Sequence, residues 1–115
     1  MNRIALITIT ALILFCLAGN VSAHSPRDLN LTYNQTTGNV SAAFIHEVSL
    51  PDTHYVMNVK VFLNGNETIN QDYTTQPTAD LFVYEYPLNA TSGDQIDVSG
   101  ECNIGGMIQR SLMVE

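Results

Sequence analysis

The sequence predicts an all-β protein, an immunoglobulin-like antiparallel β-sandwich of about seven strands that follows a signal peptide helix. Beyond residue 23, short segments of alternating apolar and polar residues follow one another, with turn-forming residues between them. Alternation with a period of two is typical of half-buried strands, and this part of the chain has no convincing helical period. Seven short strands in roughly 90 residues is the spacing of an immunoglobulin-like sandwich.

Residues 1–23 have the three parts of a cleavable signal peptide. Residues 1–3 form a short, positively charged segment, and residues 4–18 are almost continuously apolar. Residues 21–23 are the small residues of a cleavage site. The apolar run has about fifteen residues, whereas a helix that spans a bilayer needs about 20. We therefore predict cleavage before His24 and a secreted or cell-surface protein, with an uncleaved N-terminal anchor as the alternative.

The remaining residues, 24–115, are predicted to form one domain, because about 90 residues can bury one core but not two. They contain all 11 acidic residues and only three basic ones, Arg27, Lys60 and Arg110, which gives a formal charge of −8. A surface this negative repels phosphate backbones and anionic lipids. We therefore expect binding neither to nucleic acid nor to a membrane surface. The acidity also keeps an extracellular protein soluble.

Five Asn-X-Ser/Thr triplets make the protein a candidate glycoprotein. They begin at Asn30, Asn34, Asn39, Asn66 and Asn89. Because the motif is only three residues long, an Asn- and Thr-rich β protein also produces such triplets by chance.

Two strands are predicted in the first part of the domain. Leu29, Leu31 and Tyr33 alternate with polar residues, residues 34–39 supply a turn, and residues 40–47 form the second strand. Pro51 and the residues around it then interrupt the pattern.

The clearest alternation lies in residues 54–63, where one face is predicted to be core: Tyr55, Met57, Val59, Val61 and Leu63. Asn64-Gly65 supplies the positive φ angles of a tight hairpin, so residues 67–73 should fold back antiparallel onto this strand. Three further strands are predicted, in residues 80–86, 95–102 and 107–114.

Cys102 is the only cysteine left once the signal peptide is removed, so it cannot form an intrachain disulfide. An exported protein usually oxidises its cysteines, and a lone thiol therefore needs another explanation. A buried inert thiol, an intermolecular bridge and a metal ligand all remain open.

The three histidines suggest where a metal could bind. His46 ends one predicted strand, His54 begins the next, and Cys102 ends a third, so the three side chains could meet at one end of a sandwich. His24 is the predicted new N-terminus. Imidazole and thiolate together suit zinc, copper or iron, whereas calcium requires oxygen ligands.

Three segments resemble, in order, the iron-binding motifs of the superoxide reductase/desulfoferrodoxin domain family: His24-Ser25-Pro26, His46 with His54-Tyr55-Val56, and Cys102-Asn103-Ile104-Gly105-Gly106. The resemblance covers nearly all of residues 24–115. It implies an immunoglobulin-like sandwich with a mononuclear non-haem iron, and an oxidoreductase that reduces superoxide to peroxide with electrons from a donor. By this match His24, His46 and His54 are equatorial ligands and Cys102 is the axial thiolate.

The chain also departs from the family pattern. Gly105 stands where the family has its fourth histidine, the interval from His46 to His54 is longer than in the family, and the Glu-Lys pair before the first histidine is missing. These differences leave two alternatives open. One is a metal-free interaction module. The other is a copper carrier, in which cleavage before His24 frees an α-amine beside its imidazole. The sequence identifies no catalytic residue and leaves the oligomeric state open.

Overall fold

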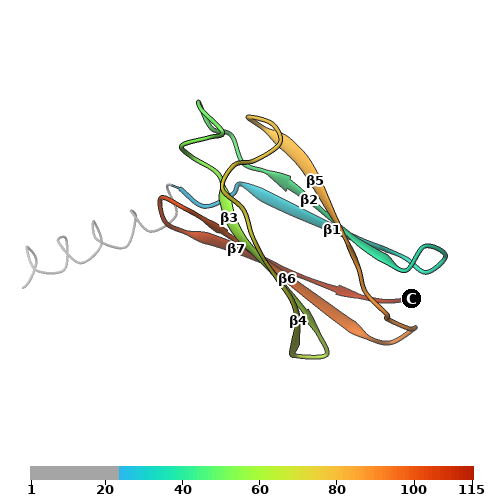
Figure 1. Ribbon diagram of the computed structural model, residues 1–115. Helices are drawn as coiled ribbons and strands as arrows, with labels where there is room; N and C mark the ends of the chain where they lie inside the picture. The colour runs from blue at the N-terminus through green and yellow to red at the C-terminus, as the bar shows by residue number, and fades with distance from the viewer. Residues whose placement is uncertain (1–23) are drawn as a thin grey trace, which may run out of the picture.

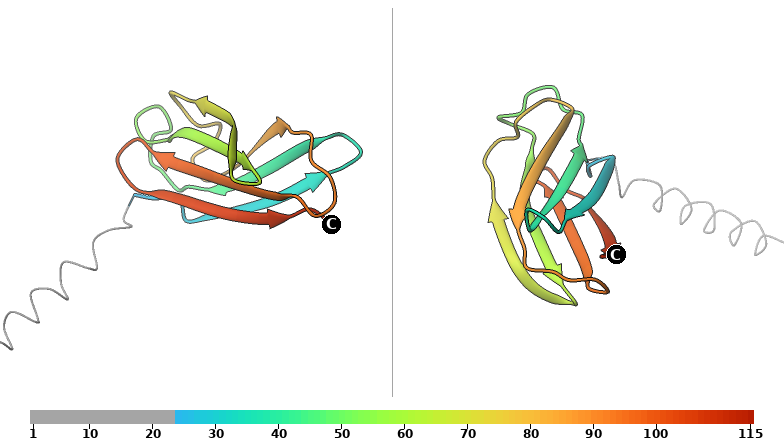
Figure 2. Two further views of the ribbon diagram at one scale, coloured as in Figure 1. Left: turned by 90° about the horizontal axis from the view of Figure 1, so that it is seen from below. Right: turned by 90° about the vertical axis from the view of Figure 1, so that its right-hand side faces the viewer.

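The computed structural model describes residues 24–115, so the predicted signal peptide lies outside the described residues. Within residues 24–115 seven antiparallel strands form two sheets packed face to face (Figures 1 and 2). The strands are β1 (Asp28–Asn34), β2 (Asn39–Ile45), β3 (Val56–Leu63), β4 (Asn66–Asp72), β5 (Leu81–Pro87), β6 (Gln95–Cys102) and β7 (Met107–Met113). One sheet has the order β1-β2-β5 and the other β4-β3-β6-β7. The predicted all-β sandwich of about seven strands is confirmed.

The hairpin between β3 and β4 forms as the sequence predicts. Asn64 and Gly65 have φ angles of 51° and 85°, which are the left-handed values that a tight two-residue hairpin turn requires. Leu63 pairs with Asn66 across the turn, and β4 runs antiparallel to β3. In the described residues no helix is long and apolar enough to cross a membrane.

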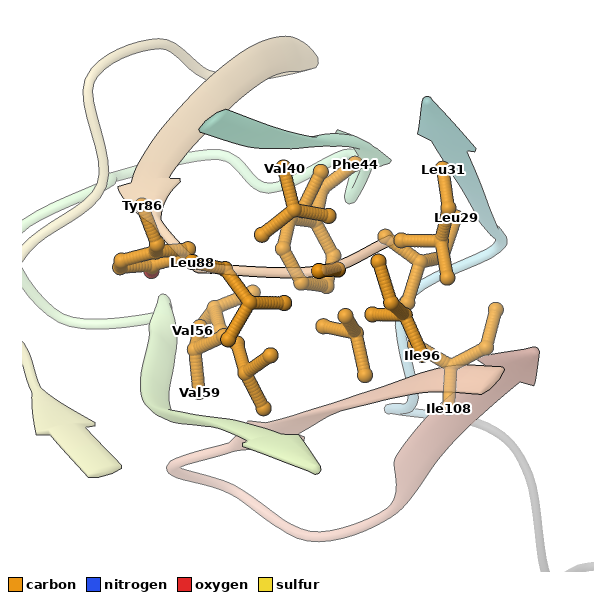
Figure 3. Packing of buried hydrophobic residues seen from close by; sticks show 14 of the residues in the cluster. Leu29, Leu31, Val40, Phe44, Val56, Val59, Tyr86, Leu88, Ile96 and Ile108 are labelled. Atoms are coloured by element: carbon orange, nitrogen blue, oxygen red, sulfur yellow. The ribbon is translucent and has the colours of Figure 1, made fainter. Parts of the chain in front are cut away.

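The core lies between the two sheets and is filled by alternate residues of facing strands. Figure 3 shows Val40 and Phe44 of β2 pointing toward Val59 of β3 and Ile96 of β6. All four are completely buried. Gly100 on β6 lies directly beneath the Phe44 ring, and a Cβ added there would overlap the ring carbons. A glycine is therefore needed at this strand position because the ring occupies the space of a side chain.

Two residues predicted to be in the core lie outside it. Tyr55 and Met57 are only partly buried and line a pocket on the outer side of the four-stranded sheet, whereas Val56 is completely buried. The cause is a β-bulge: Val56 pairs with Cys102 and Asn58 with Glu101, so Met57 has no partner of its own. An extra residue in one strand reverses the alternation beyond it. The prediction is confirmed for Val59 and Val61, which lie after the bulge.

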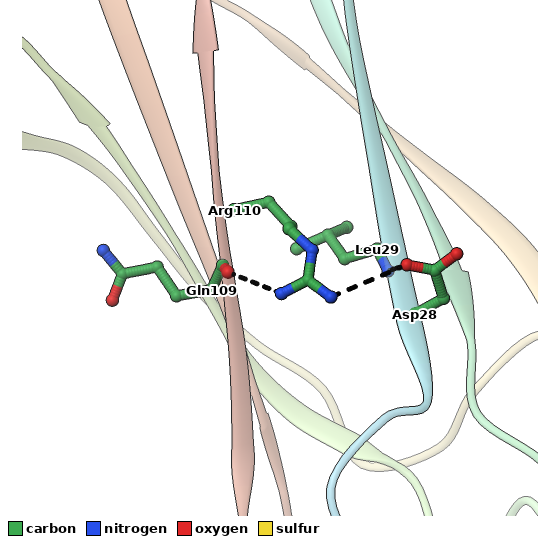
Figure 4. A network of polar contacts seen from close by, with 4 residues as sticks. All are labelled: Asp28, Leu29, Gln109 and Arg110. Atoms are coloured by element: carbon green, nitrogen blue, oxygen red, sulfur yellow. Dashed lines mark hydrogen bonds and ion pairs between the residues drawn. The ribbon is translucent and has the colours of Figure 1, made fainter.

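The two sheets come together along β1 and β7 at one side of the sandwich. There Arg110 of β7 lies 3.8 Å from the Asp28 carboxylate of β1 and also donates to the Gln109 main-chain oxygen (Figure 4). Both side chains of the ion pair are about half exposed. An exposed pair of this kind contributes little stability, so apolar burial holds the sheets together.

We expect Gly100→Ala to lower the free energy of unfolding by about 1–3 kcal/mol, because the methyl group must displace the buried Phe44 ring. Chemical denaturation measures the loss. Gln109→Ala on neighbouring β7 is a matched control, since Gln109 is exposed. Equal stability of the two variants would contradict this account of the packing.

Candidate metal centre

Three strand ends position the candidate site at one end of the sandwich. His46 directly follows β2, His54 lies two residues before β3, and Cys102 is the last residue of β6. β2 belongs to the three-stranded sheet, and β3 and β6 are neighbours in the four-stranded sheet. The site therefore lies where the chain crosses from one sheet to the other.

His46, His54 and Cys102 meet as the sequence analysis predicts. Each offers one ligand atom, and these atoms all lie within 4.8 Å of one another. His54 Nε2 is 3.1 Å from Cys102 Sγ. The two imidazole rings stand almost perpendicular, at 88°, with their centroids 4.7 Å apart. This arrangement places two nitrogen donors and one sulfur donor close enough together to hold one metal ion.

Two members of the group are buried more deeply than the third. His46 is 3% exposed and Cys102 is 1% exposed, whereas His54 is partly exposed. The thiol therefore lies on the protein side of the group. A metal held here would have its sulfur ligand and the His46 imidazole shielded from water, with the His54 imidazole closer to solvent.

Asn103 fixes His54 beside Cys102. Its side-chain oxygen accepts a hydrogen bond from the Tyr55 amide at 2.9 Å, and its side-chain nitrogen donates to the Thr53 carbonyl at 3.0 Å. The main-chain N–H of Asn103 also donates a hydrogen bond to the Tyr55 main-chain carbonyl at 3.1 Å. The residues on both sides of His54 are thus tied to the residue that follows Cys102. Sequence analysis placed Asn103 in a motif but assigned it no role.

The buried side chain of Gln76 hydrogen-bonds to both the ring and the main chain of His46. It is 3% exposed, and its Oε1 lies 2.9 Å from His46 Nδ1 and 3.1 Å from the Val56 amide nitrogen. Its Nε2 donates to the main-chain oxygens of His46 and Thr78, each at 2.9 Å. The sequence alone does not reveal Gln76, because nothing in its loop distinguishes a buried glutamine from an exposed one.

His24 lies beside the group without belonging to it. Its ring is exposed, with its centroid 6.0 Å from that of His54. The main-chain oxygen of His24 lies 3.1 Å from His46 Nε2. The assignment of the His24 imidazole as a ligand therefore stays a prediction.

The turn between β6 and β7 explains why His24 is so near. Gly106 has a φ of +86°, and a Cβ there would lie 2.8 Å from the Ser25 amide nitrogen. Only glycine allows this approach, and Figure 1 shows the segment before β1 passing beside the turn. Gly105 has a φ of +132°, a value that a histidine would adopt only with strain.

A pocket of about 550 Å³ opens beside the two imidazoles. It is lined by His24, Ser25, Pro26, Arg27, His46, Glu47 and His54. Cys102 is not among these residues, so the thiol does not line the pocket. Arg27 and Glu47 form an ion pair of 2.8 Å at this pocket. In the sequence, Arg27 is recognisable only as one of three basic residues.

The pKa of His54 is below its usual value. Burial is the largest cause, and the neighbouring His46 and His24 lower the pKa further, while a hydrogen bond to the His24 main chain opposes them. A lower pKa keeps the imidazole neutral to lower pH, and the neutral form is the one that binds a metal.

The donor set limits the metals that the site could hold. Two imidazoles and one thiolate suit iron, copper and zinc and do not suit calcium or magnesium. Three protein donors also leave coordination positions for a fourth residue or a small molecule.

The chain matches no protein-family model and no curated protein sequence.

We expect the free energy of unfolding of the metal-free protein to fall between about pH 7 and pH 5, in part through His54. The unfolded imidazole takes up a proton near pH 6.5 and the folded one only at lower pH, so protonation favours the unfolded state in this window. Chemical denaturation across the window measures the slope. His54→Gln should flatten it, and an unchanged slope would show that His54 contributes nothing.

Proposed function

We propose that residues 24–115 are a secreted, mononuclear metal-binding domain related to the superoxide reductase/desulfoferrodoxin family. The metal is iron, held by His24, His46, His54 and Cys102. One observation carries the proposal: donor atoms of His46, His54 and Cys102, from distant parts of the sequence, lie within 4.8 Å of one another.

The positions of the motifs in the fold support this assignment. The matched segments follow the family order in the sequence, and the two-sheet sandwich brings the ends of β2 and β6 and the start of β3 together. An immunoglobulin-like sandwich is the fold that the resemblance implies, and sheets of three and four antiparallel strands fit it.

The residues fit a thiolate-ligated iron in part. Two imidazoles and a shielded thiolate converge, and the His24 ring lies beside them. The fourth histidine of the family pattern has no counterpart, because Gly105 stands in its place with a φ of +132°. At most three imidazoles are therefore available to the iron.

Iron bound here would supply one-electron redox chemistry. Reduction of superoxide to hydrogen peroxide takes up one electron and two protons, so the proposed activity also needs an external electron donor. The chain's own residues provide access and shielding. The pocket beside the imidazoles admits a small oxygen species, while the burial of Cys102 keeps water from the thiolate.

A copper carrier is the second candidate. The observation that favours it is the place of His24, whose ring and main chain both lie next to the other two histidines. If the chain is cleaved before His24, the free α-amine and the imidazole of that residue can chelate one copper ion, with His46, His54 and Cys102 close by.

The first test is metal content. The full chain is expressed with export, its mature N-terminus is determined by mass spectrometry, and bound iron, copper and zinc are quantified. We expect about one iron per chain and a visible thiolate-to-metal absorption band. Cys102→Ser should abolish the band and His54→Ala should lower the metal content, because each variant removes a side chain that coordinates the metal directly. Gln109→Ala, at an exposed position on β7 outside the group of donors, serves as control.

Two results would overturn the assignment to iron. Wild-type protein without stoichiometric metal favours the metal-free module, and copper in place of iron favours the carrier. Full copper affinity in a protein with one residue added before His24 would exclude the N-terminal chelate.

A second test concerns Arg27, the cation at the pocket. With azide as an anionic probe of the metal-loaded protein, Arg27→Gln should weaken binding about threefold to tenfold, because it removes a nearby positive charge. Glu47→Gln should strengthen binding by a similar factor, because it frees Arg27 from its ion pair. Optical titration at low salt measures both affinities.

Arg110→Gln is the matched control for Arg27→Gln. Arg110 is also exposed and also pairs with a carboxylate, but it does not line the pocket. Equal azide affinities of the Arg27 and Arg110 variants would show that Arg27 does not attract the anion.

A further inference from the structure

Gln76 is buried with every hydrogen-bonding group of its side chain in use. Its Oε1 faces the Val56 amide and His46 Nδ1, and its Nε2 faces the main-chain oxygens of His46 and Thr78. The loop that contains Gln76 thereby reaches both ends of the connection between β2 and β3. Buried polar groups are normally hydrogen-bonded because an unpaired one costs free energy, and Gln76 meets this requirement with four partners.

Main-chain groups fix which way the Gln76 amide points. The Val56 N–H can only donate, so the atom facing it must be the side-chain oxygen. The His46 and Thr78 carbonyls can only accept, so the atom facing them must be the side-chain nitrogen. All three contacts are 2.9–3.1 Å long. If the side-chain amide were flipped, its nitrogen would face the Val56 N–H donor and its oxygen would face the two carbonyl acceptors, so all three hydrogen bonds would be lost.

The fixed amide in turn fixes the His46 tautomer. Since Gln76 Oε1 can only accept, His46 Nδ1 at 2.9 Å must carry the proton and donate it. The Nε2 atom of the neutral ring then has its lone pair directed away from Gln76, to the side where the His24 main-chain oxygen lies.

The His24 oxygen, 3.1 Å from Nε2, would by itself favour a proton on Nε2 instead. The Gln76 contact outweighs it for two reasons. Gln76 and His46 are each 3% exposed, so a mismatch between them could not be relieved by water, whereas His24 is exposed. Gln76 is also held by three main-chain bonds and cannot turn.

We propose that Gln76 is a positioning residue that selects Nε2 of His46 as the metal-binding atom. The inference deepens the proposed function and rests on it for the role of the metal. Ligand histidines commonly donate their second N–H to a neighbouring group, which sets ring orientation and tautomer. Here an uncharged amide fills that position, and the same side chain closes the loop between the two histidines.

The first experiment uses the full chain, exported, purified and stripped of metal, with ¹⁵N-labelled histidine at about pH 8, where neutral imidazole dominates. Long-range ¹H–¹⁵N spectra identify the protonated ring nitrogen. We expect His46 in the Nδ1–H form in the wild type and a mixture of both tautomers in Gln76→Met, whose thioether sulfur is only a weak hydrogen-bond acceptor.

The second experiment measures cobalt(II) affinity through the thiolate-to-metal band. Gln76→Met should bind cobalt(II) about 10- to 100-fold more weakly, the range found for lost partners of ligand histidines. Thr78→Ala is the matched control: it removes bonds to Leu81 and Asp80 in the same loop but leaves the Gln76 amide contacts in place. This variant should keep the tautomer and bind cobalt(II) within about twofold of the wild type.

The Nε2–H tautomer in the wild type would overturn the proposal, and this result does not depend on whether Gln76→Met folds. Equal losses of cobalt(II) affinity in Gln76→Met and Thr78→Ala would also overturn it, because loop stability alone would then explain both. If the wild type shows the Nδ1–H tautomer but binds no cobalt(II), the tautomer assignment stands and the proposed function fails.

Discussion

The pairing of β3 with β6 is the constraint on which both the core and the candidate site depend. These strands lie in the middle of the four-stranded sheet, and Val59, Val61, Ile96 and Val98 on them are completely buried. At the end of the ladder Val56 pairs with Cys102. The chain that enters β3 must therefore pass beside the last residue of β6, which places His54 next to the thiol.

The bulge in β3 connects this pairing to the site. It turns Val56 into the core and moves Met57 to the outside, so the inward face of the sheet continues to the level of Cys102. Without the extra residue, the alternation that buries Val59 would direct Val56 to solvent. Met57 would then face the core in place of Val56, as the uninterrupted alternation of the sequence predicts.

Side-chain amides complete the hydrogen bonding where the strands end. The Asn103 side chain hydrogen-bonds to the residues on both sides of His54. The Gln76 side chain hydrogen-bonds to the Val56 amide and the His46 carbonyl. Among residues 24–115 no buried side-chain nitrogen or oxygen lacks a hydrogen-bond partner. The buried side-chain polar groups around the histidines thus have partners without a metal, as expected of a preorganised site.

The sequence by itself determined the strands, the hairpin at Asn64-Gly65 and the three residues that meet, because these follow from local alternation, turn chemistry and the positions of strand ends. It did not determine the inner face of β3, since a bulge exists only in relation to a partner strand. Only the tertiary structure decided what Asn103, Gln76 and Arg27 contact. Their contacts join residues that are remote in sequence, and a polar side chain carries no local signal of what it will touch. The sequence predicted that His46, His54 and Cys102 could meet at one end of a sandwich, and the family resemblance added His24. Packing against Gly106 and the two amides then set how closely each of them approaches the others.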